Sequence, residues 1–157
     1  MNTHKNARLM AWVRQEIVTR VEAGETQQVW IGDITYLESP VRGMFWYLYL
    51  IMDSCSRRIM GWAVHPTQSD AHAAALFTTV RHEQTVSTTG LVLYADNGDP
   101  MKGAVMLATF ERLGIVPSLS RPLVSDDNPY SATLSRTLQH YPAFPSQPFG
   151  DLEVART

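Results

Sequence analysis

Apolar residues recur at two different spacings along this chain. In residues 4–24 they repeat about every 3.6 residues, which predicts an amphipathic helix that Gly24 ends. After that segment the pattern turns to runs rich in aromatic and β-branched residues, which predict strands at Val29–Leu37, Met44–Asp53 and Arg58–His65. The connection at Val41-Arg42-Gly43 suits a hairpin, so these strands are expected to form an antiparallel meander.

The second half of the chain alternates helices with strands. Ser69 is the predicted N-cap of an alanine-rich helix over 70–84, and Gly114 ends a helix near 101–113. Further elements are the strands Leu91–Ala95 and Ile115–Leu119 and a helix that begins near Asn128-Pro129. A meander extended by strands that alternate with helices predicts an α/β fold, a mixed five-stranded sheet with helices on both faces.

Composition and charge narrow this picture. The chain has 157 residues, 45% of them hydrophobic, which suits one domain with a buried core. The net charge of −2 excludes the broad basic surface expected of many nucleic-acid binders. A single cysteine excludes an internal disulfide and a cysteine-based zinc site. No apolar run reaches the length of a membrane span or resembles a signal peptide, so the expected location is cytoplasmic, without a membrane partner.

Two aspartates stand where such a sheet presents chemistry. Asp33 interrupts an otherwise apolar strand, and Asp96 directly follows the buried strand Leu91–Ala95, near the carboxyl strand ends where α/β sheets bind ligands. Each aspartate taken alone is more often a structural hydrogen-bond acceptor than a metal ligand. Two carboxylates that converge on neighbouring strands favour a hard divalent cation, Mg²⁺ or Mn²⁺.

Other polar and aromatic residues receive structural interpretations. Asp53 is expected to cap the hairpin turn that holds Cys55. The histidines lack metal-ligand spacing. The aromatic run Phe45-Trp46-Tyr47 with Tyr49 is interpreted as core and sheet surface, with base stacking as the less favoured alternative.

Several linked motifs resemble a known family. The chain reads Trp30-x-x-Asp33-Ile34-Thr35-Tyr36, Tyr47-Leu48-Tyr49-Leu50-Ile51-Met52-Asp53 and Ser56-Arg57-Arg58-Ile59-Met60-Gly61-Trp62. It continues with Asp96-Asn97-Gly98-Asp99-Pro100-Met101-Lys102-Gly103, Ser120-Arg121-Pro122 and Asp127-Asn128-Pro129-Tyr130-Ser131. In this order the motifs resemble the integrase catalytic core of bacterial insertion-sequence transposases, part of the DDE transposase and retroviral integrase superfamily. The resemblance implies a ribonuclease H-like fold.

The resemblance also implies an active site and a departure from it. It makes Asp33 and Asp96 the first two catalytic and metal-binding carboxylates. The family carries its third, a glutamate, where this chain has Ala132. Intact relatives are expected to cleave DNA and transfer strands with two Mg²⁺ ions about 4 Å apart. Asp126 and Asp127, in the loop before Ala132, are the less favoured alternative source of a third carboxylate.

Further departures concern charge. Asp99 replaces a common serine, Gln139-His140-Tyr141 replaces a lysine-tyrosine-arginine triplet, and Gln147 replaces a common arginine. Lost cations and a gained anion weaken attraction to phosphate. The remaining candidate DNA contacts are Lys102, Arg121 and Arg136, for which solvated surface charges are an equal alternative.

The expected function is therefore a transposase-type core, inactive or nearly so because of Ala132, with DNA ends and target DNA as implied partners. The further departures favour natural decay over an engineered change. The alternative is a non-enzymatic DNA-binding or self-association module, and an active nuclease that uses another carboxylate ranks last. The expected domains are a helical segment at 1–27 and a core at 28–157, truncated at its C-terminal end. Homo-oligomers are expected, with Phe45, Trp46 and Tyr49 as apolar surface.

Overall fold

A computed structural model describes residues 29–84, 90–96, 98–119 and 147–157 of the chain. The first half forms β1 (Val29–Glu38), β2 (Phe45–Asp53) and β3 (Ile59–His65). The second half adds α2 (Asp70–Gln84), β4 (Val92–Ala95), α3 (Asp99–Lys102), α4 (Ala104–Leu113), β5 (Val116–Leu119) and α6 (Leu152–Arg156). The helix expected at 4–24, within the segment 1–27, and the helix expected from Asn128 lie outside the described residues.

The five strands form one mixed sheet in the order β3-β2-β1-β4-β5. The pairs β1–β2 and β2–β3 are antiparallel, whereas β1–β4 and β4–β5 are parallel. The first hairpin closes where Met44 N–H donates to the Val41 carbonyl at 3.0 Å, and Gly43 takes the positive φ of 84° that the turn requires. The predicted meander and its parallel extension are confirmed.

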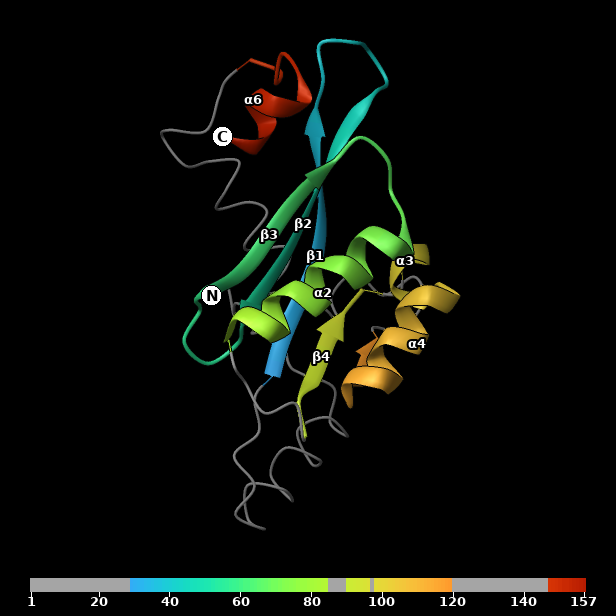
Figure 1. Cartoon of the computed structure of the whole chain (residues 1–157). Coiled ribbons are helices and arrows are strands. Elements are labelled where there is room, and N and C mark those ends of the chain that lie inside the picture. Colours follow the sequence, from blue (N-terminus) through green and yellow to red (C-terminus); the bar gives the residue numbers. More distant parts are fainter. Residues whose placement is uncertain (1–28, 85–89, 97, 120–146) are drawn as a thin grey trace, which may run out of the picture.

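The main core lies between the sheet and the helices α2, α3 and α4, which pack on the same face (Figure 1). Trp30, Ile51 and Leu93 project from the strands into this core and are fully buried. Phe77 of α2 meets Phe110 of α4 edge to face, with their ring centroids 6.0 Å apart. Burial of large apolar side chains on one sheet face is what fixes the helices against it.

The opposite face of the sheet carries a smaller apolar cluster of Ile31, Leu50 and Met52. Side chains alternate between faces along a strand, so Asp33 shares this face with Ile31. Its Cα partner on β2 is Leu50, which belongs to the same cluster. Among the described helices, α2, α3 and α4 do not pack on this face, and Asp33 lies on it in the central strand β1.

The single helix predicted near 101–113 is wrong in one respect, because it is broken into α3 and α4 at Gly103. Gly103 has φ −60° and ψ 149°, an extended conformation that interrupts helical hydrogen bonding. The cause is tertiary: a Cβ at Gly103 would overlap the side chain of Asp70, which accepts a hydrogen bond from Val105 N–H at 3.1 Å. Asp70, at the start of α2, thus anchors the start of α4.

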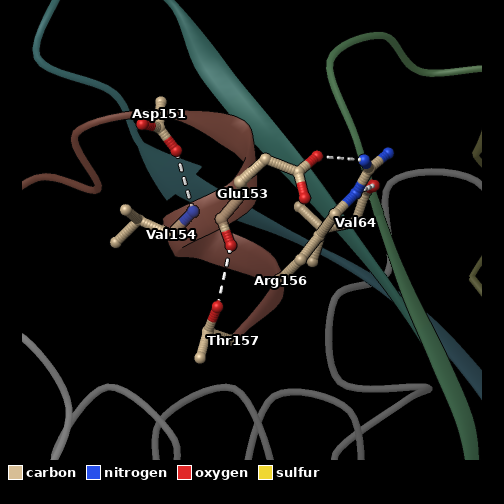
Figure 2. A network of polar contacts seen from close by, with 6 residues as sticks. All are labelled: Val64, Asp151, Glu153, Val154, Arg156 and Thr157. Carbon is tan, nitrogen blue, oxygen red and sulfur yellow. Dashed lines mark hydrogen bonds and ion pairs between the residues drawn. The ribbon is translucent and has the colours of Figure 1, made fainter.

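A short helix near the C-terminus was not predicted. Asp151 caps α6 by accepting from Val154 N–H at 2.8 Å, and Arg156 forms an ion pair with Glu153 at 2.7 Å (Figure 2). The Nε of Arg156 also donates to the Val64 carbonyl of β3 at 3.1 Å. These contacts hold α6 beside β3. None of the described helices is long and apolar enough to cross a membrane.

Candidate active site

The candidate site lies where β1 and β4 run parallel. Their register pairs Trp30 with Leu93 and Gly32 with Ala95. The next residue of β1 is Asp33, and the residue that follows β4 is Asp96. Neighbouring strands lie about 4.8 Å apart, so one further step of the register sets the two aspartates beside each other. Their predicted positions, on the first strand and just past the fourth, are confirmed.

Asp33 is held by the middle of the sheet. It is half-buried, and its backbone is part of a strand paired on both sides up to Gly32. The hydroxyl of Thr35, two residues along the same face, donates to Asp33 Oδ2 at 3.1 Å. This hydrogen bond orients the carboxylate and stabilises its charged form.

Asp96 occupies a more open position. Its side chain is exposed, and its Oδ1 accepts a hydrogen bond from Gly98 N–H at 3.3 Å. A Cβ at Gly98 would lie 3.1 Å from that same oxygen, so the glycine allows the loop to fold closely around the carboxylate. The chain then enters α3 through Asp99 and Pro100, with proline at a first-turn position.

A cavity of about 290 Å³ opens beside Asp96. Its other lining residues are Ile34, Tyr36, Gln68, Gly98, Asp99 and Pro100. Because β4 ends at Ala95, β1 continues from Asp33 to Glu38 with β2 as its strand neighbour on one side only, among the described strands. The cavity lies along this part of β1, which extends beyond the end of β4.

The sequence did not predict Tyr36 or Gln68 as site residues. The signal that identifies Tyr36 is strand alternation, which puts residues 34 and 36 on the same face, toward the helices. Gln68 precedes α2 and reaches the cavity only through the fold, so no local pattern marks it.

The donor chemistry of the two aspartates suits a hard divalent cation, because carboxylate oxygens are the ligands that such ions prefer. The number of donors is incomplete. Within the described ranges no group of three histidine, cysteine, aspartate or glutamate side chains could hold a metal ion. Ala132, the position of the family's glutamate, lies outside the described residues.

The other predicted residues divide into described and undescribed ones. Lys102 is exposed in the last turn of α3. Arg121 and Arg136, together with Asp126 and Asp127, lie outside the described residues, so their roles stay predictions.

Asp53 caps the hairpin turn, as expected. Its Oδ2 accepts from both the N–H and the hydroxyl of Ser56, each at 2.7 Å, and Cys55 is exposed in this turn.

The predicted apolar surface of Phe45, Trp46 and Tyr49 is wrong for Tyr49. Tyr49 is only 1% exposed, because it faces α2 and its hydroxyl both donates to the Ser69 carbonyl and accepts from Ser69 N–H. Burial is the main cause that raises the pKa of Tyr49 above its ordinary value. Trp46 is half-buried and donates to the Phe149 carbonyl at 3.3 Å, whereas Phe45 is exposed.

Two histidines without an assigned role form a stacked pair. The rings of His65 and His72 lie parallel, with their centroids 3.8 Å apart. Burial, then the neighbouring His72 and Arg156, lowers the pKa of His65 below its ordinary value.

Comparison with known sequences gives one family and several transposases. The family described as "Integrase core domain" matches residues 24–124. The transposase for insertion sequence element IS904 of Lactococcus lactis is 26% identical over 140 residues, which cover 87% of this chain and 53% of that protein. The chain therefore spans about half the length of the curated relatives it matches.

Comparison with solved structures gives the same fold. The catalytic domain of Mos1 mariner transposase matches with a TM-score of 0.67 at 13% identity, over 99% of this chain and 79% of that one. A chain of the simian T-cell lymphotropic virus intasome in complex with PP2A regulatory subunit B56 gamma matches with a TM-score of 0.59 at 15% identity. That match covers 71% of this chain and 38% of the other. At such low identity the similarity establishes the ribonuclease H-like fold.

Proposed function

We propose a function for this chain, which belongs to the integrase core domain family within the DDE transposase superfamily. The chain is a catalytic core for metal-dependent cleavage and transfer of DNA strands. It has lost most or all of this activity. One observation carries the first part of the proposal. The parallel register of β1 and β4 ends at Gly32 and Ala95, directly before Asp33 and Asp96, and Asp96 lines an open cavity. The second part rests on Ala132.

Each described residue would contribute a distinct property to the site. Asp33 would hold a divalent cation from the rigid middle of the sheet, with Thr35 as a positioning residue. Asp96 would supply a second carboxylate from a loop that Gly98 folds tightly around it. When bound, the cations supply activation of an attacking water or 3′-hydroxyl and stabilise the leaving oxygen. Both acids are therefore required in their charged form.

Ala132 explains the proposed loss of activity. Two dications a few ångströms apart repel strongly, and two aspartates leave much of that charge uncompensated. A glutamate at this position would complete the set of anionic ligands, whereas the methyl group of alanine offers none. The second cation would therefore bind weakly.

DNA is the proposed partner, and the chain is expected to bind it with modest affinity. Phosphate contacts dominate DNA affinity, and the net charge of −2 gives little general attraction. Lys102, Arg121 and Arg136 are the proposed phosphate contacts. Self-association is proposed on Phe45, the exposed residue of the predicted apolar surface, at 37% exposure.

Restoring the missing carboxylate tests the proposed function. The present chain, Ala132→Glu, and Ala132→Glu combined with Asp96→Asn are compared for cleavage of a labelled DNA duplex with Mn²⁺. The first is expected to cleave at background, the second above it, and the third at background again. Glutamate is a good helix former, so the substitution should be mild for folding.

Two other outcomes contradict parts of the proposal. If the present chain and Ala132→Glu cleave equally well, another residue already supplies the third ligand and the chain is active. If none of the three cleaves while DNA binding persists, the chain is a non-enzymatic DNA-binding module of the same fold. Light scattering that shows a monomer at high concentration contradicts self-association.

A further inference from the structure

An exposed aromatic ring stands at the edge of the Asp96 cavity. Tyr36 lines this cavity and is 51% exposed, although it lies within a strand. A tyrosine combines an apolar ring face with a polar hydroxyl, which suits contact with a ligand at a partly wet surface. The ring therefore offers accessible apolar surface directly beside a candidate catalytic carboxylate.

Two neighbouring rings fix Tyr36 in place. Phe45 meets it nearly perpendicularly, at 88° with the centroids 5.8 Å apart, and Tyr47 meets it at 64° and 5.2 Å. Tyr47 is the direct cross-strand partner of Tyr36, and Phe45 is the diagonal one. These edge contacts restrict the ring, so a ligand that packs on its exposed part loses little side-chain entropy.

The charge of the cavity selects the kind of ligand. Among its described lining residues the charged ones are Asp96 and Asp99, both acidic. A phosphate group would be repelled here unless cations intervened. A neutral planar group avoids this cost. Ile34 and Pro100 add apolar surface, and the exposed amide of Gln68 offers one donor group and one acceptor.

We propose that Tyr36 is a stacking platform for one unpaired base of the DNA strand that Asp96 engages, with Gln68 bonding to the edge of that base. This inference rests on the proposed function, because the cavity is continuous with Asp96. Only an unstacked base exposes its ring face and its pairing edge together, so the occupant is a single-stranded nucleotide next to the scissile site rather than an intact duplex. At about 290 Å³ the cavity suits one base.

The proposed stacking role of Tyr36 is tested by comparing how tightly the chain binds two DNA molecules. The full chain is titrated at low salt with a blunt labelled duplex and with the same duplex carrying a single-stranded 3′ extension. The variants are Tyr36→Leu, Tyr36→Phe and, as a matched control, Trp62→Leu. Trp62 is as exposed as Tyr36 but pairs with Leu50 on the opposite sheet face and is not among the cavity residues.

The original chain is expected to prefer the extended DNA. Tyr36→Leu should weaken binding of the extended DNA by roughly 5- to 100-fold while leaving the blunt duplex unchanged. Tyr36→Phe keeps the ring and should bind like the original chain, as should Trp62→Leu. A direct measurement needs no variant: 5-iodouracil in the extension should photo-crosslink to Tyr36, as mapped by mass spectrometry.

The remaining outcomes overturn the inference in distinguishable ways. Unchanged binding by Tyr36→Leu, or crosslinks mapped elsewhere, refutes the platform and leaves the proposed DNA-processing function standing. Equal losses in Tyr36→Leu and Tyr36→Phe assign the effect to the hydroxyl and refute stacking. Binding of neither DNA by the original chain refutes both the platform and the proposed function.

Discussion

Two strand ends of the same sheet carry an aspartate, and the two carboxylates are used differently. Asp53 ends the antiparallel strand β2, where its Oδ2 accepts two 2.7 Å hydrogen bonds from Ser56 and closes a tight turn. Asp96 follows the parallel strand β4, accepts a 3.3 Å bond from Gly98 and borders a cavity. The tight hairpin after β2 uses the carboxylate of Asp53 to cap its turn. The longer connection that follows β4 leaves space for a ligand site beside Asp96.

The same comparison separates Asp70 from the candidate site. The carboxylate of Asp70 accepts from Val105 N–H and packs against Gly103, so it connects two helices. Hydrogen bonds that close a turn or join two helices mark Asp53 and Asp70 as structural acids, and a position at the end of a parallel strand beside a cavity marks a candidate ligand. The residue type alone does not distinguish them.

The largest expected effect comes from disrupting the contact between Asp70 of α2 and Gly103 at the start of α4. Gly103→Val would push its side chain into Asp70 and separate α3 from α2, which should cost about 3 kcal/mol of unfolding free energy. Urea unfolding followed by circular dichroism measures it. Gly150→Val is the matched control, because a Cβ there meets nothing within 4 Å. Equal stability of the two variants would show that the Asp70 contact is not important.

A smaller effect separates the two strand-end aspartates. Asp53→Ala should cost about 1 kcal/mol, since it leaves the backbone N–H of Ser56 without its acceptor, and it should leave Mn²⁺ affinity unchanged. Asp96→Ala should change stability by less than about 0.5 kcal/mol and weaken Mn²⁺ binding. Chemical denaturation and calorimetric titration with Mn²⁺ measure the two properties. A reversed pattern would contradict the assignment of roles.

How far the sequence predicts the molecule depends on the range of the interactions involved. The strands and α2 follow from local alternation and capping, and their predicted ends lie within one residue of the observed ones at β1, β2, β3 and β4. The break at Gly103 arises from contact with Asp70, more than thirty residues earlier in the chain, which no local pattern reveals. The five-residue helix α6 is too short for periodicity to identify.

The candidate site divides in the same way. Asp33 and Asp96 were predicted because each interrupts or ends an apolar run, a local signal that the family resemblance strengthened. The cavity was not predicted, because Tyr36, Gln68 and Pro100 come from three separate segments that meet only in the folded chain.

The smallest expected effect is on the pH dependence of stability and comes from His65, the last residue of β3. Burial, His72 and Arg156 lower the folded-state pKa of His65, so folding favours its neutral form. The contribution of neutral His65 to the free energy of unfolding is fully present above the pKa of histidine in the unfolded chain, about 6.5. It is lost as the pH falls through the lower pKa of His65 in the folded chain. The urea midpoint should therefore drop more between pH 7.5 and pH 5 in the original chain than in His65→Asn. Equal drops would contradict this role of His65.

The central claim is that Asp33 and Asp96 hold a cation together while Asp53 does not. A crystal of the full chain soaked in Mn²⁺ and measured for anomalous scattering tests it most directly. The account predicts a manganese peak about 2 Å from a carboxylate oxygen of both Asp33 and Asp96, and none at Asp53. Carboxylates of Asp33 and Asp96 more than about 8 Å apart, or a peak bound by Asp96 and Asp99 without Asp33, would contradict it.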